Sequence, residues 1–302
     1  MSRTSEKLRV AILGSGNIGT DLLVKVLQSP LLECTRFIGR RDNSPGMLKA
    51  KELGMRTSDR CLDEIIDNPD CCDLVFDATS ARSHREHWPI LERLGKIVID
   101  MTPSRVGQMV VPAVDVRSCV QYRNVNMVSC GGQASLPLAY ILGQVHDGIE
   151  YLEVVSSIAS RSAGPGTRVN IDEYVETTES ALRTYSGANA AKVILILNPA
   201  EPCIHMQTTV SAKLSSPRLE QLRPLLDGML QKVRSYVPGY EIVVPPVWEH
   251  NRIVMSVRVT GRGDYLPEYA GNLDIINCAA IAAAEEYAEN IGKVRSARGE
   301  EE

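Results

Sequence analysis

The chain has 302 residues, of which 44% are hydrophobic, 23% are charged and 5% are aromatic, and its formal net charge is −4 at pH 7. This length suffices to bury a large core without disulfides, which predicts a globular protein of one large or two ordinary domains. The charges are of mixed sign and form no basic stripe, which excludes nucleic acid as an expected partner. The sequence contains no apolar run of about 18 residues, so no membrane span is expected.

The N-terminal sequence MSRTSEKLRV lacks the apolar core of a signal peptide, which favours a cytoplasmic protein. In that reducing compartment the eight cysteines have little use for disulfides, and no CxxC pair occurs. We expect most of them to be small buried hydrophobes or idle thiols. The histidines and cysteines show no zinc-ligand spacing, so no metal site is predicted.

Short β-rich runs alternate with helical patterns over the first part of the chain. The strand-like runs read LRVAILG, CTRFIGR, DLVFDA, KIVIDM and VNMVSC, and the helical patterns cover residues 17–28, 59–67 and 84–94. This alternation is typical of α/β proteins, in which crossover helices connect the strands of a parallel sheet.

The first turn of this region contains a glycine pattern. The run VAILGSGNIGTDLL places Gly14, Gly16 and Gly19 in a GxGxxG between a strand and a helix. In dinucleotide-binding Rossmann folds the first glycine allows the tight turn, the second lets the backbone approach a pyrophosphate, and the third lets helix and strand pack closely. The pattern therefore predicts a dinucleotide site, and the alternative is an ordinary turn without a ligand.

The end of the second strand bears on which dinucleotide is bound. About 20 residues beyond the glycine loop, NAD sites usually carry an acid that binds the ribose 2′-hydroxyl. Here Arg40 and Arg41 occupy that place, and Asp42 follows one step later. Two arginines with Ser44 nearby suit the 2′-phosphate of NADP, whereas Asp42 reaching back suits NAD. Both readings stay open, as does an exposed basic turn without a cofactor role.

Cys130 lies in an unusual local setting. In NVNMVSCGGQASLPLAYIL a strand-like run leads into Cys130, then into two glycines and a helical pattern in which we place Pro137 in the first turn. Open α/β sheets bind ligands at the carboxyl ends of their strands. A thiol at a helix N-terminus is expected to have a lowered pKa, which makes a nucleophile. The alternative is an inert cysteine buried at a domain junction.

The pattern changes after Tyr151. Longer β-rich runs surround one helix at residues 217–236, which predicts a largely antiparallel sheet with helices on one face. The Ala-rich tail at 270–290 is again helical. We therefore predict a dinucleotide-binding domain at residues 1–129, to which the C-terminal helix 270–302 returns, and a catalytic and dimerisation α+β domain at residues 130–269.

A nucleotide loop and an activated cysteine together indicate oxidation of an aldehyde. The thiolate adds to the aldehyde, the thiohemiacetal gives hydride to nicotinamide, and a thioester remains. Water, phosphate or a thiol as the second substrate then decides the enzyme. The loop SAGPGT, residues 162–167, carries small polar residues that suit the lining of a site, although a plain connecting turn would look similar.

Several long motifs carry a resemblance over nearly the full length, from about Lys7 to Ile291. They are GSGNIGTDLL, DATSARSH, NVNMVSCGGQAS, SAGPGTRVNIDEYVETT, LNPAEP, YVPGY and GDYLPEYAGNLDI. Together they resemble the acylating, CoA-dependent acetaldehyde dehydrogenases of aromatic meta-cleavage pathways. The fold that this resemblance implies is a Rossmann-type parallel sheet domain plus an α+β domain similar to that of glyceraldehyde-3-phosphate and semialdehyde dehydrogenases.

The resemblance also implies an activity and partners. The reaction is the conversion of acetaldehyde or a similar short aldehyde, NAD or NADP, and coenzyme A to acyl-CoA, with Cys130 carrying the acyl thioester. Family members usually pair with a 4-hydroxy-2-oxovalerate aldolase that passes the aldehyde through a channel, so a homo- or hetero-oligomer is expected.

The predicted cofactor-binding residues fall into two groups. The glycine loop and the end of the second strand contribute Gly14, Gly16, Gly19 and Arg41, and the resemblance implies that Ser15, Gly16, Asn17 and Ile18 also lie on the dinucleotide. The resemblance adds Asn272 on the nicotinamide side and a second segment made of Ser162, Ala163, Gly164, Pro165, Gly166, Thr167, Arg168, Val169 and Asn170.

Two positions depart from the family pattern. Arg41 aligns with an aspartate that usually ends the second strand, which puts strict NAD preference in doubt. Thr208 stands where the family typically has an aspartate near the catalytic cysteine, and a threonine hydroxyl cannot act as a base near neutral pH. General-base assistance is typically worth about 10²–10⁴-fold in rate. The alternative function is therefore an impaired or redirected relative, a nucleotide-binding scaffold or regulatory partner of an aldolase.

Two histidines are weighed for chemical roles. If residues 203–208 form a strand, His205 and Thr208 lie on opposite faces, which favours a core or interface histidine over a catalytic one. His84 begins a helical pattern, which favours a structural role over lining a cofactor cleft.

Overall fold

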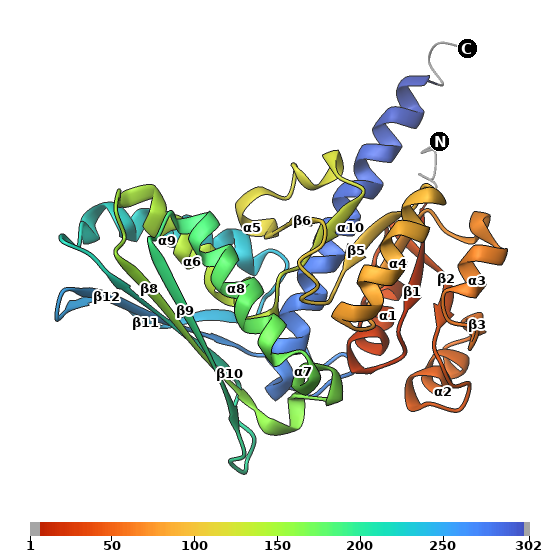
Figure 1. The fold of residues 1–302 in the computed structure, drawn as a ribbon, viewed down its shortest axis with the longest axis horizontal. Coiled ribbons are helices and arrows are strands. Elements are labelled where there is room, and N and C mark those ends of the chain that lie inside the picture. The colour runs from red at the N-terminus through yellow and green to blue at the C-terminus, as the bar shows by residue number, and fades with distance from the viewer. Residues whose placement is uncertain (1–6, 299–302) are drawn as a thin grey trace. The chain divides into compact units, whose positions relative to one another are not determined.

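A computed structural model describes residues 7–298 of the chain (Figure 1). The described residues divide into two compact units. One unit contains the described parts of Met1–Val110, Asp115–Met127 and Ala280–Glu302, and the other contains Val111–Val114 and Val128–Ala279. The two ends of the predicted domains, residues 1–6 and 299–302, lie outside the described residues.

The first unit is built on a seven-stranded sheet in which all neighbouring strands are parallel. The strand order is β3-β2-β1-β4-β5-β7-β6. The chain adds strands on one side of β1 up to β3 and then on the other side from β4 onward, as in doubly wound folds. The strands are β1 Leu8–Leu13, β2 Leu32–Ile38, β3 Thr57–Ser58, β4 Leu74–Asp77, β5 Ile97–Asp100, β6 Gln108–Met109 and β7 Asn124–Asn126. The predicted Rossmann-type sheet is confirmed.

Helices connect these strands. They are α1 Asn17–Gln28, α2 Pro45–Glu52, α3 Asp63–Asp67, α4 Ala81–Arg93 and the short α5 Pro112–Asp115, with 3₁₀ turns η1 Pro69–Cys71 and η2 Cys119–Gln121. Helix α3 begins at Asp63, later than the pattern at 59–67 indicates, and α2 was not predicted. Pro45 in the first turn is the signal for α2, because proline is favoured at a helix start.

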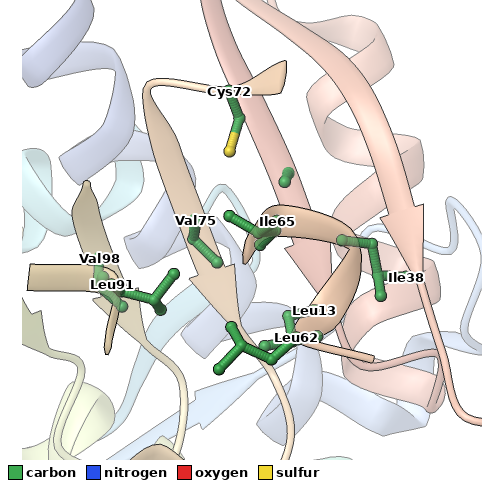
Figure 2. Packing of buried hydrophobic residues seen from close by; sticks show 9 residues of the cluster. Leu13, Ile38, Leu62, Ile65, Cys72, Val75, Leu91 and Val98 are labelled. Carbon is green, nitrogen blue, oxygen red and sulfur yellow. The ribbon is translucent and has the colours of Figure 1, made fainter. Parts of the chain in front are cut away.

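A buried cluster fixes the strands of the first unit against α3 and α4 (Figure 2). Its members are fully or almost fully buried: Ala11, Leu13, Ile38, Leu62, Ile65, Cys72, Val75, Leu91 and Val98. They come from β1, β2, β4 and β5, from α3 and α4, and from the connections that contain Leu62, directly before α3, and Cys72, directly after η1. Strands covered on both faces read as continuous apolar runs, as LRVAIL does. The cluster thereby holds the carboxyl ends of these strands, where ligands bind in this fold.

The second unit contains a five-stranded sheet in the order β11-β12-β10-β8-β9. The strands are β8 Tyr151–Ala159, β9 Ala190–Asn198, β10 Met206–Lys213, β11 Tyr240–Glu249 and β12 Arg252–Val259. Three of the pairings are antiparallel, whereas β8 and β9 are parallel. The parallel pair arises because a crossover containing helices separates these two strands, a βαβ arrangement within a sheet predicted as largely antiparallel.

Helices α6 Cys130–Val145, α8 Ile171–Ser186 and α9 Leu219–Arg234 lie on one face of this sheet, as predicted (Figure 1). The remaining elements are η3 Ser160–Ser162, α7 Pro165–Val169, η4 Glu268–Ala270 and the long α10 Gly271–Arg298, which begins in the second unit and continues into the first. None of the described helices is both long and apolar enough to cross a membrane.

The side chains of β10 alternate between the two faces of the sheet. Met206, Thr208, Val210 and Ala212 are buried, whereas Gln207 between them is exposed. The alternation predicted for this segment is therefore confirmed for Gln207 and Thr208, and it turns the threonine toward the helices.

Candidate active site

The glycine loop has the geometry that the sequence predicted. Gly14 has a φ of 120°, and an added Cβ would lie 2.4 Å from the carbonyl oxygen of Ala78. An added Cβ on Gly19 would lie 1.8 Å from the carbonyl oxygen of Gly14, whereas one on Gly16 would meet nothing within 4 Å. Gly16 is also the N-cap residue of α1, and no side chain there accepts a hydrogen bond from the first turn of the helix. The backbone at Gly16 is thus open to a pyrophosphate, and these residues fit a dinucleotide.

The start of α2, the helix that follows β2, packs against the glycine loop. The hydroxyls of Ser15 and Ser44 lie 3.1 Å apart, and an added Cβ on Gly46 would lie 2.3 Å from the carbonyl oxygen of Ser15. Asp42, the alternative acid for the ribose 2′-hydroxyl, forms an ion pair with Lys51.

Arg40 and Arg41 are exposed, and among the described residues neither forms an ion pair. Their guanidinium groups are therefore available to an anion near the cofactor loop.

A buried polar cluster lies where β4 and β5 end. His84 on α4 is fully buried, and its Nδ1 lies 3.0 Å from Asp77 Oδ2 while its Nε2 lies 3.5 Å from Asp100 Oδ2. His87 Nδ1 lies 2.9 Å from the same Asp77 oxygen. The structural role favoured for His84 fits its place near the start of α4, although its side chain binds the strand carboxylates and Ser80 caps the helix.

A repeated sequence pattern marks these carboxylates. Asp77 and Asp100 each end a strand and are followed two residues later by a threonine. Asp100 Oδ1 accepts hydrogen bonds from the Thr102 backbone N–H at 2.8 Å and from its hydroxyl at 2.7 Å, and Asp77 Oδ1 is bound by Thr79 in the same way. This cluster was not identified from the sequence, and the repeated Asp-x-Thr pattern is the signal that could have predicted it.

The charges of Asp77 and His84 support each other, whereas burial raises the pKa of Asp100 to about 6. Burial disfavours the charge on His84, but its bond to Asp77 and the nearby Asp100 outweigh burial and raise the pKa of the imidazole above its ordinary 6.5. Burial likewise acts against the charge of Asp77, yet the bonds to His84 and His87 hold its pKa below the usual range. The Asp77 carboxylate therefore favours the protonated form of the buried His84 at the carboxyl ends of the strands.

Cys130 is the first residue of α6, and a strained turn places it there. Val128, between β7 and α6, has a φ of 62°, a conformation that β-branched residues rarely adopt. Ser129 caps the helix, and its hydroxyl accepts the Gly132 backbone N–H at 2.9 Å. The predicted position of Cys130 at a helix N-terminus is confirmed.

The placement of Pro137 in the first turn is wrong, because α6 begins at Cys130 and Pro137 lies within the helix. The residues around Pro137 are buried. Tertiary packing therefore outweighs the hydrogen bond that proline cannot donate.

The predicted lowering of the Cys130 pKa is also wrong. Although part of the side chain stays accessible, burial of the thiol raises its pKa to about 11. The backbone N–H groups of Gly131 and Cys130 and the hydroxyl of Tyr174 act in the opposite direction without overcoming burial. No charged side chain contributes to the shift. The helix N-terminus stabilises the thiolate less than the surrounding protein opposes it.

A group of buried hydroxyls lies beside Gly131, the residue that follows Cys130. Ser156 on β8 lies opposite Thr208 on β10, and their hydroxyls are 3.0 Å apart. Both residues are fully buried. Tyr174 on α8 lies close enough to Cys130 to lower the pKa of its thiol, and the Ser156 hydroxyl lies close enough to Tyr174 to lower the pKa of the phenol. Sequence reasoning identified Thr208 but missed Ser156 and Tyr174.

The second predicted cofactor segment forms a tight loop between β8 and α8. Arg168 donates its Nε to the carbonyl oxygen of Ala163 at 3.1 Å, and Asn170 donates to that of Gly166 at 2.6 Å. Added Cβ atoms on Gly164 or Gly166 would meet nothing within 4 Å, so the backbone of the loop is accessible.

Asn272 has unsatisfied polar atoms. It is 1% exposed, and neither its Nδ2 nor its Oδ1 has a hydrogen-bond partner among the described residues. A buried amide without partners is uncommon and is consistent with a group that binds there when a ligand is present. His205 directly precedes β10, and its Nδ1 is likewise buried without a partner in the described part of the chain.

Comparison with known proteins places these features in a family. Residues 130–267 match the family model "Prokaryotic acetaldehyde dehydrogenase, dimerisation", and residues 9–115 match "Semialdehyde dehydrogenase, NAD binding domain". An acetaldehyde dehydrogenase from Spirochaeta aurantia is 58% identical over 284 residues, which cover 94% of this chain and 96% of the relative. One from Pectobacterium atrosepticum is 55% identical over 287 residues, covering 94% and 97%.

Solved structures show the same fold at low identity. Aspartate semialdehyde dehydrogenase II from Vibrio cholerae, complexed with ASA, has a TM-score of 0.61 at 15% identity and covers 94% of this chain and 98% of its own. Aspartate semialdehyde dehydrogenase with NADP from Candida albicans has a TM-score of 0.63 at 12% identity and covers 93% and 100%. The chain belongs to the acetaldehyde dehydrogenase family, and its first unit carries an NAD-binding domain.

Proposed function

We propose that the protein is an acylating acetaldehyde dehydrogenase, which converts acetaldehyde or a similar short aldehyde and coenzyme A to acyl-CoA. The observation that carries this proposal is Cys130, held by a strained turn at the N-terminus of α6 with backbone N–H groups directed at its sulfur. This geometry suits a nucleophile that must form and release a thioester. The relatives that bear the name acetaldehyde dehydrogenase support the aldehyde as substrate.

The residues predicted to bind a nicotinamide cofactor suit its pyrophosphate and its nicotinamide ring. The open backbone at Gly16 and the N-terminus of α1 would hold the pyrophosphate, and the unsatisfied amide of Asn272 would serve the nicotinamide side. When bound, the cofactor supplies the hydride acceptor. The exposed Arg41 would accommodate a 2′-phosphate, so we propose that NADP is accepted beside NAD.

Cys130 performs the covalent chemistry in this proposal. Its thiol loses a proton to solvent, and the sulfur forms a bond to the carbonyl carbon of the aldehyde. After the hydride has left that carbon, a thioester joins the acyl group to Cys130. The thiol of coenzyme A then bonds to the acyl carbon, the bond to Cys130 breaks, and the enzyme thiol is regenerated. The backbone N–H groups at the start of α6 stabilise the sulfur anion at both ends of this sequence.

We further propose that the two predicted domains divide the work. Residues 1–129, with the C-terminal helix, bind the dinucleotide, and residues 130–269 carry the nucleophile and the contact between subunits. The sheet face of the second unit opposite its helices exposes large apolar side chains, Ile194, Ile196, Val244 and Val247. Together with the family model named for dimerisation, this face supports association with a second copy. The aldolase partner and the cytoplasmic location stay predictions of the resemblance and the sequence.

Absorbance at 340 nm tests the proposal. The purified protein is mixed with acetaldehyde and either NAD or NADP, with and without coenzyme A, beside a Cys130→Ala variant. We expect reduction that depends on coenzyme A and falls by at least about 10³-fold in the variant, because the nucleophile is lost.

The alternative, a nucleotide-binding scaffold that has lost turnover, is favoured by Thr208 alone. It predicts dinucleotide binding without reduction in any of these mixtures. Reduction that is unaffected by coenzyme A would indicate a dehydrogenase that uses water or phosphate instead.

A further inference from the structure

Tyr174 lies directly over the residue that follows the nucleophile. An added Cβ on Gly131 would lie 2.0 Å from the Tyr174 hydroxyl oxygen and 3.0 Å from the ring carbon that bears it. Position 131 therefore has no room for a Cβ atom while this hydroxyl is present, which requires glycine there. Tyr174 is 5% exposed, so its hydroxyl points into the protein beside Cys130 and not into solvent.

A chain of hydrogen bonds fixes this position. Thr178, one turn along α8, donates its hydroxyl to the carbonyl oxygen of Tyr174 at 2.6 Å. Its oxygen also lies 2.6 Å from the hydroxyl of Ser129. Because the Thr178 proton is already engaged, Ser129 donates to Thr178 and accepts the Gly132 N–H. The helix of Tyr174 is thus tied to the cap of the helix of Cys130.

The Tyr174 hydroxyl is itself unsatisfied. Within the described residues it has no hydrogen bond of full geometry, although Cys130 and Ser156 are close enough to affect its protonation. The Ser156 hydroxyl is already paired with that of Thr208. Buried hydroxyls without partners are rare, and one beside a nucleophile suits a partner that gains negative charge when the nucleophile ionises or reacts.

We propose that Tyr174 is a catalytic hydrogen-bond donor to the sulfur of Cys130 and then to the oxygen of the aldehyde adduct. The inference rests on the proposed function, because it assigns Tyr174 a step of that reaction. Thr208, at the position where the resemblance implies an aspartate, interacts with Ser156. Tyr174 is the side chain that contacts Cys130, so it supplies the polar interaction at the nucleophile.

The electrons and protons of the step balance without a proton from Tyr174. A sulfur lone pair forms the bond to the carbonyl carbon, and the π pair of the carbonyl moves to its oxygen. That oxygen is two bonds from the sulfur, so a donor that reaches one reaches the other. When hydride leaves the carbon, the oxygen pair forms the carbonyl again. The pKa of Tyr174 is raised well above 10, mainly by burial and secondly by the neighbouring Cys130. The phenol therefore stays a neutral donor throughout.

The test compares the full-length Tyr174→Phe variant with wild type and with Tyr240→Phe. Tyr240 is a matched control, because it is also a buried tyrosine whose hydroxyl contacts α6, donating to the Ala134 carbonyl at 2.7 Å. The first readout is the rate at which iodoacetamide alkylates Cys130, followed by mass spectrometry of its peptide from pH 7 to 10. The second is kcat and KM for reduction with acetaldehyde and coenzyme A.

In Tyr174→Phe we expect alkylation at each pH to slow about tenfold or more, because a hydrogen bond to the thiolate is lost. We expect kcat to fall about 10²-fold with little change in KM, the usual cost of removing one oxyanion donor. Tyr240→Phe should leave both the alkylation profile and kcat near wild type.

Each outcome decides a separate claim. A Tyr174→Phe variant with the alkylation profile and kcat of wild type overturns the inference and leaves the proposed function intact. A wild-type protein that reduces no cofactor overturns the proposed function, and the alkylation profile then still decides whether Tyr174 donates to Cys130. Equal losses in Tyr174→Phe and Tyr240→Phe would show a structural effect and overturn the donor role.

Discussion

The two units bury polar groups at their candidate sites in different ways. In the first unit, carboxylates and imidazoles meet as a buried cluster, in which Asp77 and His84 each favour the ionised form of the other. In the second unit the groups near Cys130 are neutral hydroxyls, and no charged side chain shifts the thiol pKa, which burial raises to about 11. The charged cluster is stable only while complete. The hydroxyl cluster leaves the nucleophile dependent on directed hydrogen bonds.

The largest effect on stability is expected at the charged cluster. His84→Leu leaves the Asp77 and Asp100 carboxylates buried without their shared partner, which should lower the free energy of unfolding by about 3–5 kcal/mol. His87→Leu is a matched control, because His87 binds the same Asp77 oxygen but is partly exposed. It should cost about 1 kcal/mol. Urea unfolding measures both, and similar losses would show that burial of the pair does not matter.

A smaller effect is expected where Gly131 and Tyr174 meet. Gly131→Ala should lower the free energy of unfolding by about 1–3 kcal/mol, because the new methyl group overlaps the Tyr174 hydroxyl. In a Tyr174→Phe background that oxygen is absent and the cost should shrink. Additive effects in this double-mutant cycle would contradict the close approach. Tyr174→Phe alone should leave stability unchanged or raise it, since it removes an unsatisfied buried hydroxyl.

The ion pair of Asp77 and His84 predicts a pH dependence of stability. Because the pKa of His84 is raised on folding, its contribution is complete below about pH 6.5 and is lost as pH rises through the folded value. Because the pKa of Asp77 is lowered, its contribution is present above about pH 4 and is lost as pH falls. The pair should therefore stabilise most between about pH 4 and 6.5. Unfolding measured from pH 5.5 to 9 should show a decline to which Asp100 contributes near pH 6, because burial raises its pKa to about 6. His84→Gln should reduce the part of the decline above about pH 6.5, and an unchanged decline there would contradict the assignment.

The smallest effect is expected at the cofactor loop. Arg41→Ala should weaken NADP binding about tenfold or less, because Arg41 is exposed and its charge is screened by water. NAD, which lacks the 2′-phosphate, should bind as before. Titration of both cofactors by fluorescence separates the cases, and equal weakening of NAD and NADP would show that Arg41 does not recognise the 2′-phosphate.

The parts of the fold predicted from sequence are those fixed by local pattern. Apolar runs gave the parallel sheet, because strands covered on both faces leave a continuous signal. The roles predicted for Gly14 and Gly19 match the turn and the helix packing, whereas the role of Gly16 in approaching a pyrophosphate stays a prediction. Cys130 was placed at a helix N-terminus because the glycines after it mark the turn.

The parts that were missed depend on tertiary packing. Nothing in the helical pattern around Tyr174 shows that its hydroxyl meets Gly131, which lies on a helix more than forty residues earlier. The raised pKa of Cys130 depends on the protein packed around it, whereas sequence shows only the helix N-terminus. Asp77 and Asp100 could have been recognised from their repeated Asp-x-Thr pattern at neighbouring strand ends.

The central claim is that Cys130 carries the acyl group between the aldehyde and coenzyme A, and peptide mass spectrometry tests it most directly. The protein is incubated with acetaldehyde and oxidised cofactor, without coenzyme A, then quenched in acid and digested. We predict an acetyl group on the Cys130 peptide, which disappears when coenzyme A is added before the quench while acetyl-CoA forms. Reduced cofactor without acetylated Cys130, or an acetyl group that coenzyme A does not remove, would contradict it.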